Sequence, residues 1–416
     1  MKSPQLFLET APSQPDPSEL RDWSHLPDLI LREVLQRLVP CLRSLSAFAG
    51  ACRPWRRFLL ASASTLLLPR IPPLLLKHER CYFGGSPGSF LLRAWSALVI
   101  RQPITSPLAA AAASTSASLL SSSRGLLIFL VRPRGLLVLV DALTGAERLS
   151  LPLPSPHAPH HYAALTTTHL VLFVSKHAFA SIPFPPAAAA APDWAHHRLP
   201  RAASFVASIT EFRGRVLGVT DRAQLLEFRC LAAAAAPAPE EEAAVEMLPA
   251  TGLPDAATFE SWHFGPRLVV AGDRLLLLLL MTDPAHRGGA TGRPVKVHRV
   301  SVHALHETPD GAMRRWEEVD NLGGYSVFVD CAGRSAVACA DAAGCGDVAG
   351  NCIYFAEMTF HREYCQRYWM SLSPWWKWEH SAAAENKDAA TISRKWPSQT
   401  WAYPRLFFQS STAAQL

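Results

Sequence analysis

Near the N-terminus, apolar residues recur at the three- and four-residue steps of an amphipathic helix. One side of this predicted helix is apolar throughout: Ile30, Leu31, Val34, Leu35 and Leu38. Charged and amide side chains fill the other side, and Glu33 and Arg37 stand four residues apart in the favourable orientation. Pro27 suits the first turn, Ser24 is close enough to cap it, and Pro40 ends it.

Two further short helices follow the same pattern. The inner positions of the second are Leu42, Leu45, Phe48, Ala49 and Cys52, and the third begins at Pro54 and turns Trp55, Phe58 and Leu59 inward. Helices of about ten residues are not stable alone, so the three must share one small core. A core this thin leaves apolar residues around Leu26 and Pro27 available to a second protein.

After residue 60 the helical period fades, and short apolar runs alternate with turn residues. Three pairs of runs are separated by turn sequences and are predicted to be hairpins: 125–130 with 136–140, 216–220 with 225–228, and 268–271 with 275–281. Further strands are predicted at 169–174, 179–182, 295–305, 325–329, 336–340 and 353–358. The leucine-rich run 275–281 is short and follows a Gly-Asp turn, which favours a buried strand over a helix.

The strand pairs recur about every 40–50 residues, which is compatible with the blades of a propeller, although no kelch or WD signature repeats. The predicted fold class is therefore α+β and multidomain: three N-terminal helices, then a mostly antiparallel, propeller-like β domain from about residue 65. Its predicted core includes Trp316, Phe328, Ile353 and Phe355. Two glycines at 323–324, where a strand meets a turn, are predicted to allow positive φ or a close approach of the backbone, and Asn351 is predicted to form a turn before a buried strand.

The helical segment resembles an F-box in the order of its apolar residues. Leu-Pro at 26–27, Leu-Ile at 29–30, Val34 and Leu38 are followed by Leu45 and by the closing Cys52 and Trp55. In that family the module docks on a Skp-type adaptor, which links it to a cullin-RING ubiquitin ligase. The resemblance implies six adaptor-binding residues: Leu26, Pro27, Leu29, Ile30, Val34 and Leu38. The alternative is an ordinary helical hairpin with a buried apolar stripe.

Most of the remaining chain resembles a plant F-box family with a C-terminal, kelch-related domain of unknown function. The segments that carry this resemblance are SRGLL at 123–127, LTG at 143–145, WEEVDNLGGYSVFV at 316–329, GNCIYF at 350–355 and WAYP at 401–404. Residues 80–118 depart from the pattern after CYFGG, which leaves the first blade in question.

These observations divide the chain into four parts. We expect a disordered tail at 1–21, an F-box at 22–62, a linker with a degenerate first β unit at 63–122, and the propeller-like domain at 123–408. Three alanine runs, at 109–113, 187–191 and 232–236, fall between strand pairs and are typical of tolerated loop insertions.

Composition narrows the choice of partners. The chain has 416 residues and a formal net charge of +6, but its arginines are scattered rather than gathered in a basic block, so we expect no nucleic-acid partner. No apolar run approaches the length of a membrane span, and no secretory signal is expected, so we also expect no membrane partner. Nine cysteines without such a signal indicate reduced thiols in the cytoplasm or nucleus.

We found no motif for catalysis, a metal or a cofactor. Cys331, Cys339, Cys345 and Cys352, with His361 and Cys365 nearby, lack the short spacings of structural zinc sites, which favours buried free thiols on strands. The His pairs at 160–161 and 196–197 have no matching acidic ligand motif. The chain is therefore expected not to be an enzyme.

Two hypotheses remain. In the first, the protein is the substrate-recognition subunit of an SCF-type (Skp-cullin-F-box) E3 ubiquitin ligase, and its β domain binds a target protein that the sequence does not identify. In the second, it is a binding or scaffold protein whose helices only cap the β domain.

Overall fold

The architecture comes from a computed structural model of the chain. It describes residues 23–39, 42–62, 67, 70–71, 73–78, 89–93, 99–103, 117–142, 146–156, 158, 160–186, 193–231, 244–255, 263–264, 266–282, 297–308, 313–330, 336–340, 350–356, 369–371 and 399–402. The tail expected at 1–21 and the alanine runs at 109–113, 187–191 and 232–236 lie outside these residues.

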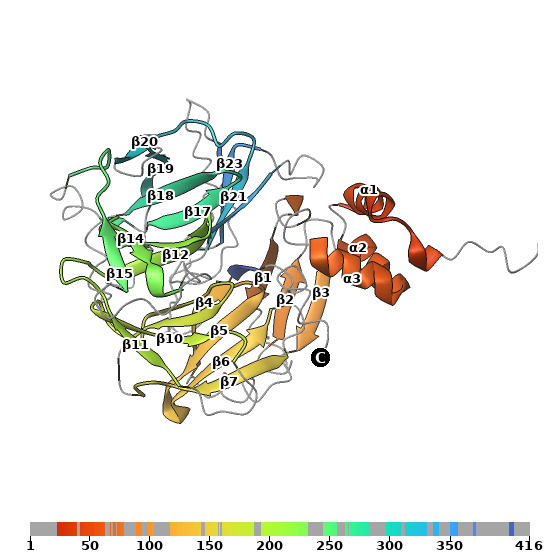
Figure 1. The fold of residues 1–416 in the computed structure, drawn as a ribbon, viewed down its shortest axis with the longest axis horizontal. Coiled ribbons are helices and arrows are strands. Elements are labelled where there is room, and N and C mark those ends of the chain that lie inside the picture. The colour runs from red at the N-terminus through yellow and green to blue at the C-terminus, as the bar shows by residue number, and fades with distance from the viewer. Residues whose placement is uncertain are drawn as a thin grey trace, which may run out of the picture.

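Three short helices lie together at one side of the β domain (Figure 1). They are α1 (Asp28–Leu38), α2 (Leu42–Ala51) and α3 (Arg53–Ser62), and the 3₁₀ turn η2 (Trp23–His25) precedes them. As the apolar spacing predicted, they share one core, formed by Leu31, Leu35, Leu45, Phe48 and Leu59 with Leu67 and Ile71 of the following segment. Trp55 and Phe58 are partly buried against it. The predicted Glu33–Arg37 pair forms on the exposed side, at 3.0 Å.

The start of α1 differs from the expectation. Pro27 immediately precedes the helix, and its carbonyl accepts hydrogen bonds from the N–H groups of Ile30 and Leu31 at 2.9 and 3.1 Å. Pro27 is the N-cap residue and makes no side-chain capping bond. Ser24, which was predicted to cap the helix, lies in the separate turn η2. Asp28 lies in the first turn, where its negative charge interacts favourably with the positive end of the helix dipole.

Six sheets are formed by the described residues and are arranged as the blades of a β-propeller (Figure 1). Three of them follow chain order from the inner to the outer strand. The first contains β4 (Ala117–Ser123), β5 (Leu126–Val131), β6 (Leu136–Asp141) and β7 (Glu147–Pro152). The second contains β8 (Tyr162–Leu165), β9 (His169–Phe173), β10 (Ala178–Pro183) and β11 (Ala195–Arg198). The third contains β12 (Val206–Phe212), β13 (Arg215–Thr220), β14 (Leu225–Phe228) and β15 (Val245–Leu248).

The next two sheets are less regular. One contains β16 (His263–Phe264) and β17 (Arg267–Ala271), both paired with β18 (Arg274–Thr282), followed by β19 (Val297–Glu307) and β20 (Arg314–Glu318). The other has the order β22 (Ala336–Cys339), β21 (Ser326–Asp330), β23 (Cys352–Ala356), β24 (Trp369–Ser371). Within it β21 and β23 run parallel, whereas the other pairs of described strands are antiparallel. The leucine-rich run lies in the strand β18, as predicted.

The last sheet joins the two ends of the β domain. Strand β25 (Gln399–Ala402) pairs with β1 (Leu74–His78), which continues to β2 (Ser89–Arg93) and β3 (Val99–Pro103). A C-terminal strand thus completes a blade that begins near the N-terminus, so the ring of sheets leaves no free end there.

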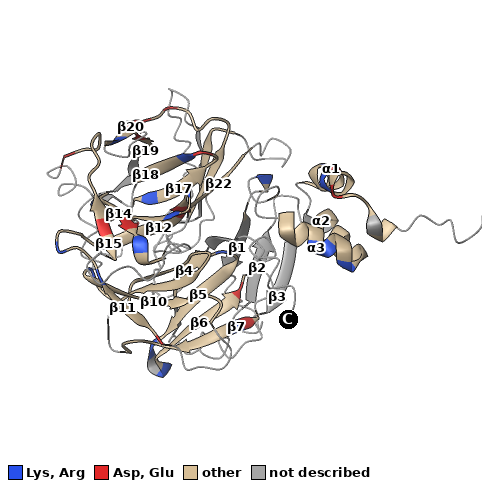
Figure 2. Ribbon diagram, viewed as in Figure 1, with Lys and Arg blue, Asp and Glu red and all other residues tan. Residues whose placement is uncertain are grey.

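Within the described residues, four pairs of neighbouring blades, from β4–β7 round to β21–β24, each enclose an apolar cluster. Strands with one apolar face, or with continuous apolar runs such as β5 and β6, supply these clusters, and β4, β5 and β6 carry no Lys or Arg (Figure 2). Three of the predicted core residues, Trp316, Phe328 and Ile353, are fully buried. The side chain of Phe355 lies outside the described residues. Gly323 and Gly324 have positive φ, and Asn351 forms the turn before β23, both as predicted.

Candidate functional site

The helical module exposes a compact apolar surface at its start. Trp23, Leu29 and Ile30 are 65%, 74% and 46% exposed. The described part of the chain has five large exposed hydrophobic residues, and these three fall within eight positions of one another. Pro27, between them, is also exposed. A cluster of this kind on a small module is typical of a protein-binding surface.

The six residues that the F-box resemblance implied divide into two groups. Pro27, Leu29 and Ile30 face outward, whereas Leu26, Val34 and Leu38 are partly buried against the helical core. The second group therefore supports the module from within. Their role in adaptor binding stays a prediction. Trp23, which precedes the pattern, extends the exposed surface and was not expected from the sequence.

Trp55 holds the start of the module in place. Its ring stacks on Phe48 at 4.7 Å between centroids, and its indole N–H donates a hydrogen bond to the Trp23 carbonyl at 2.9 Å. The exposed Trp23 is thus fixed by a contact from α3. This is the structural role expected for Trp55.

A second set of polar contacts joins neighbouring blades at the turns that follow the inner strands. Two of these turns contain two residues with positive φ: Arg124 and Gly125 between β4 and β5, and Arg213 and Gly214 between β12 and β13. Positive φ at both central positions is the requirement of the tight hairpin turn that matches strand twist, and arginine adopts it only at some energetic cost. From these turns Arg124 reaches Glu211 two blades further along the chain, and Arg213 reaches Asp273 in the next blade.

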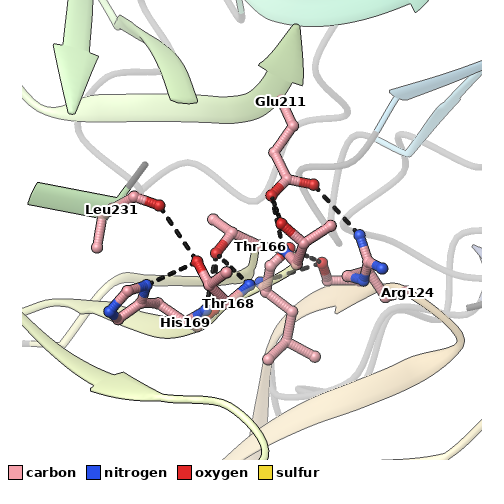
Figure 3. Close-up of polar contacts among 9 residues, drawn as sticks. Arg124, Thr166, Thr168, His169, Glu211 and Leu231 are labelled. Carbon is pink, nitrogen blue, oxygen red and sulfur yellow. Dashed lines mark hydrogen bonds and ion pairs between the residues drawn. The ribbon is translucent and has the colours of Figure 1, made fainter. Parts of the chain in front are cut away.

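Glu211 is the centre of the larger of these contacts (Figure 3). From the end of β12 its carboxylate accepts a hydrogen bond from the Arg124 guanidinium at 3.2 Å, and it also accepts the Thr167 N–H at 2.6 Å and the Thr167 hydroxyl at 2.5 Å. Arg124 and Glu211 are each less than one-third exposed. Burial lowers the pKa of the Arg124 guanidinium, and the Glu211 carboxylate opposes that shift. One carboxylate thus connects three blades.

The turn beside Glu211 is ordered by its own threonines. The Thr166 hydroxyl accepts the N–H groups of Thr168 and His169, and the Thr168 hydroxyl bonds His169 Nδ1 at 2.8 Å and the Leu231 carbonyl at 3.2 Å (Figure 3). Burial lowers the pKa of His169. These contacts hold the backbone N–H of Thr167 where Glu211 accepts it.

The same end of the propeller is closed further by two more arginines. Arg213 donates to the Asp273 carbonyl at 2.9 Å, and Arg274 donates to the Leu322 carbonyl at 2.6 Å. Arginines at this end are therefore committed to contacts between blades. The sequence carried a signal for two of them, the Arg-Gly pairs at 124–125 and 213–214, but it did not reveal their partners.

The thiols and histidines of the described residues form no group of potential metal ligands. Cys339 in β22 and Cys352 in β23 are buried free thiols, as predicted, whereas Cys331, Cys345, His361 and Cys365 lie outside those residues. Burial raises the pKa of Cys352 and raises that of Cys230 to about 11, which makes Cys230 a poor nucleophile at neutral pH.

His160 and His197, one from each predicted His pair, are held by local contacts. His160 Nε2 lies 2.8 Å from the Ser155 carbonyl, and His197 Nε2 lies 2.9 Å from the Ser181 hydroxyl. No group of three or more potential metal ligands occurs among the residues that the structure describes. Likewise, none of its described helices combines the length and apolar character needed to cross a bilayer.

A family model, the KIB1-4 β-propeller, matches residues 100–376. The match covers more than half of the chain and includes β4 to β23. The chain belongs to the KIB1-4 β-propeller family. This domain is found in plant F-box proteins, in agreement with the resemblance in the sequence. The KIB1-4 match begins after the helices, so the F-box predicted at 22–62 lies outside it.

Solved structures resemble this KIB1-4 propeller only distantly. The N-terminal domain of Nup159 is 12% identical, with a TM-score of 0.30, and the match covers 61% of this chain and 62% of that one. The β-propeller domain of Cps50 (Swd1) from Myceliophteria thermophila is 10% identical, with a TM-score of 0.25 and coverage of 56% and 79%. Hsv2 from Kluyveromyces lactis is 9% identical, with a TM-score of 0.25 and coverage of 56% and 92%. TM-scores this low support no inference about function. No curated protein matches the chain.

Proposed function

We propose that this KIB1-4 protein is the substrate-recognition subunit of an SCF-type ubiquitin ligase. The helices bind a Skp-type adaptor, and through it a cullin, while the propeller binds a target protein. The protein itself performs no catalysis and contributes proximity between ligase and target.

The observation that carries this proposal is the exposed apolar surface of Trp23, Leu29 and Ile30. The other large apolar side chains that the structure describes in the module are buried or partly buried, so exposure of these three requires an explanation outside the module. A partner that covers them removes apolar area from water, which contributes about 25 cal/mol per Å². The chain's membership of a family that is typical of F-box proteins supports the same role for the helices.

The first test changes Leu29, the most exposed apolar residue of the surface, to alanine in the full-length chain. We expect Leu29→Ala to weaken adaptor binding by about 1–3 kcal/mol, because exposed apolar anchors in small interfaces act as hot spots. The double variant Leu26→Ala/Pro27→Ala should weaken it by a similar amount, and its unfolding temperature must be unchanged for the comparison because Leu26 also packs against the helical core. Binding is measured by titration calorimetry, and the unfolding temperature is measured in parallel.

The matched control is Arg32→Ala, an exposed position on the same helix. It should bind the adaptor as the unmodified protein does. Normal adaptor affinity in folded Leu29→Ala and Leu26→Ala/Pro27→Ala variants would mean that this surface is not the adaptor interface.

One contact favours a second function, in which the helices cap the β domain. Val337 of β22 packs against the helical core, together with Leu67 and Ile71 of the connecting segment. A structural cap needs this contact, whereas adaptor binding does not. Val337→Asp therefore separates the two roles: under the adaptor function it should leave adaptor binding unchanged in the folded protein.

A further inference from the structure

A second surface forms at the opposite ends of the strands that carry the Arg124 and Arg213 turns. It consists of four neighbouring segments: the turns at 132–135, 174–177 and 221–224, and the loop at 199–205 between β11 and β12. We refer to these four segments as the basic turn face. Hydrogen bonds join three of them into one surface. The Leu199 N–H donates to the His177 carbonyl at 2.8 Å, and the Asp221 N–H donates to the Phe205 carbonyl at 2.7 Å.

The first blade reaches the same surface through its link to the second. The Arg132 guanidinium donates to the His160 carbonyl at 3.5 Å. The ring of the following residue, His161, meets Phe205 edge-on at 5.3 Å. Three consecutive blades therefore contribute to the basic turn face.

The basic turn face carries an excess of positive charge. Its four segments contain five exposed cations, and Asp221 is their only acidic residue; the cations are Arg132, Arg134, Lys176, Arg201 and Arg222. Within the part of the chain that the structure describes, none of the five forms an ion pair. At the opposite end of the strands, by contrast, Arg124, Arg213 and Arg274 are bonded to groups outside their own hairpins. The five cations are thus available to a partner.

Phe205 lies exposed within this positive surface, with 45% of its area accessible. Its loop is held rigidly: Gln224 accepts the Ser204 N–H and donates to the Ala202 carbonyl, both at 2.9 Å. A large aromatic side chain on a fixed loop loses little conformational entropy when it is covered. Aromatic anchors surrounded by polar groups are typical of the centres of protein interfaces.

We infer that the basic turn face binds an extended acidic peptide segment that carries an apolar residue. The acidic side chains pair with the cations of the four segments, and the apolar residue packs on Phe205. This inference rests on the proposed function in one respect, that the propeller's ligand is a protein. What the surface adds is the chemistry of the bound segment. Each segment carries one or two cations, and they surround an aromatic residue. This arrangement suits an extended chain whose acidic residues are distributed along its length.

The test measures binding of a fluorescent peptide, EDELFEDE, to the full-length protein by fluorescence anisotropy, without adaptor. The charge-reversed peptide KRKLFKRK, a single-stranded oligonucleotide and vesicles containing phosphatidylserine are measured under the same conditions. We expect the acidic peptide to bind best, and its affinity to fall as salt is raised.

Two comparisons between variants of this surface and control variants elsewhere locate the binding site. Arg201→Glu and Arg222→Glu should each weaken peptide binding by about tenfold or more, whereas Arg315→Glu, the same charge change at an exposed position in β20, should have little effect. Phe205→Ala should weaken it about five- to tenfold, whereas Met313→Ala, an exposed apolar residue elsewhere, should not.

Equal loss in Arg222→Glu and Arg315→Glu would overturn the inference, as would equal binding of the charge-reversed peptide. Tighter binding of the oligonucleotide or the vesicles would also overturn it, in favour of those ligands. Because no adaptor is present, a failure here is distinct from a failure of adaptor binding. The two proposals can therefore fail separately.

Discussion

At the scale of single residues, the propeller depends on a few polar side chains that reach between blades. Glu211 is the clearest case, because it accepts hydrogen bonds from two other blades at once. Apolar clusters between blades stabilise the ring, but they do little to fix how one blade is oriented against the next. Polar contacts with fixed geometry favour one orientation of the blades, because breaking such a contact leaves a hydrogen-bonding group unsatisfied.

We predict that Glu211→Ala lowers the free energy of unfolding by about 1–3 kcal/mol, since it leaves the part-buried Arg124 without its carboxylate and Thr167 without its acceptor. Chemical denaturation of the two single variants and of the double variant Arg124→Ala/Glu211→Ala measures the coupling. The control is Glu246→Ala, which removes the more exposed pair with Arg229 and should change stability by less than about 1 kcal/mol. Equal losses in Glu211→Ala and Glu246→Ala would contradict the connecting role of Glu211.

A second prediction at this scale concerns His197. Burial lowers its pKa from the ordinary value of 6.5, and the positive charges of protonated His169 and His196 would lower it further. The folded state therefore binds a proton less readily than the unfolded state. Between the unfolded pKa and the lower folded pKa, the unfolded chain holds more protons, so stability rises with pH.

The unfolding temperature should accordingly fall as the pH is lowered below 6.5, until the folded pKa is reached. In His197→Asn this dependence should be shallower. In His177→Asn, at an exposed position, it should match that of the unmodified protein. A His197→Asn profile parallel to the unmodified one would show that His197 does not contribute to the acid sensitivity.

At the scale of elements, the predicted helices and hairpins agree closely with the structure because their signals are local. The helical stripe of Leu31 and Leu35 and the Gly-Asp turn before β18 each act over a few residues. At the start of α1, Pro27 precedes the helix as its N-cap residue instead of occupying the first turn. Closure of the ring by β25 and the parallel pairing of β21 with β23 depend on partners far away in the sequence, for which the apolar pattern carries no information.

The helical module offers the sharpest prediction at this scale. Trp55→Ala should lower the stability of the module by about 3 kcal/mol, at the low end for a tryptophan because the side chain is only partly buried. It removes both the stack on Phe48 and the hydrogen bond to Trp23. Trp55→Phe, which keeps a ring against Phe48 but loses the hydrogen bond, should lose less stability. Far-ultraviolet circular dichroism during denaturation follows the change, and an undisturbed Trp55→Ala module would contradict the role given to this residue.

At the scale of the whole molecule, the protein presents two different surfaces. The helical surface is apolar and centred on Leu29, whereas the basic turn face is positively charged around Phe205. The sequence predicted available apolar residues near Leu26 and Pro27, because the order of apolar residues in a short module is visible in one dimension. In the structure Leu26 is partly buried, and Leu29 is the most exposed large hydrophobic residue described in the module. The sequence did not predict the second surface, because the cations of that face come from turns spread over about ninety positions and meet only in the folded ring. Two surfaces of different chemistry suit a protein that brings two partners together.

The most direct test of this account is a calorimetric titration of the full-length protein with a Skp-type adaptor. The account predicts a one-to-one complex with a dissociation constant of about 1 µM or tighter. It also predicts that Leu29→Asp abolishes the complex while leaving the unfolding temperature unchanged, since a charge is introduced only on the exposed surface. Absence of binding by the folded, unmodified protein at micromolar concentrations, or undiminished binding by Leu29→Asp, would contradict it.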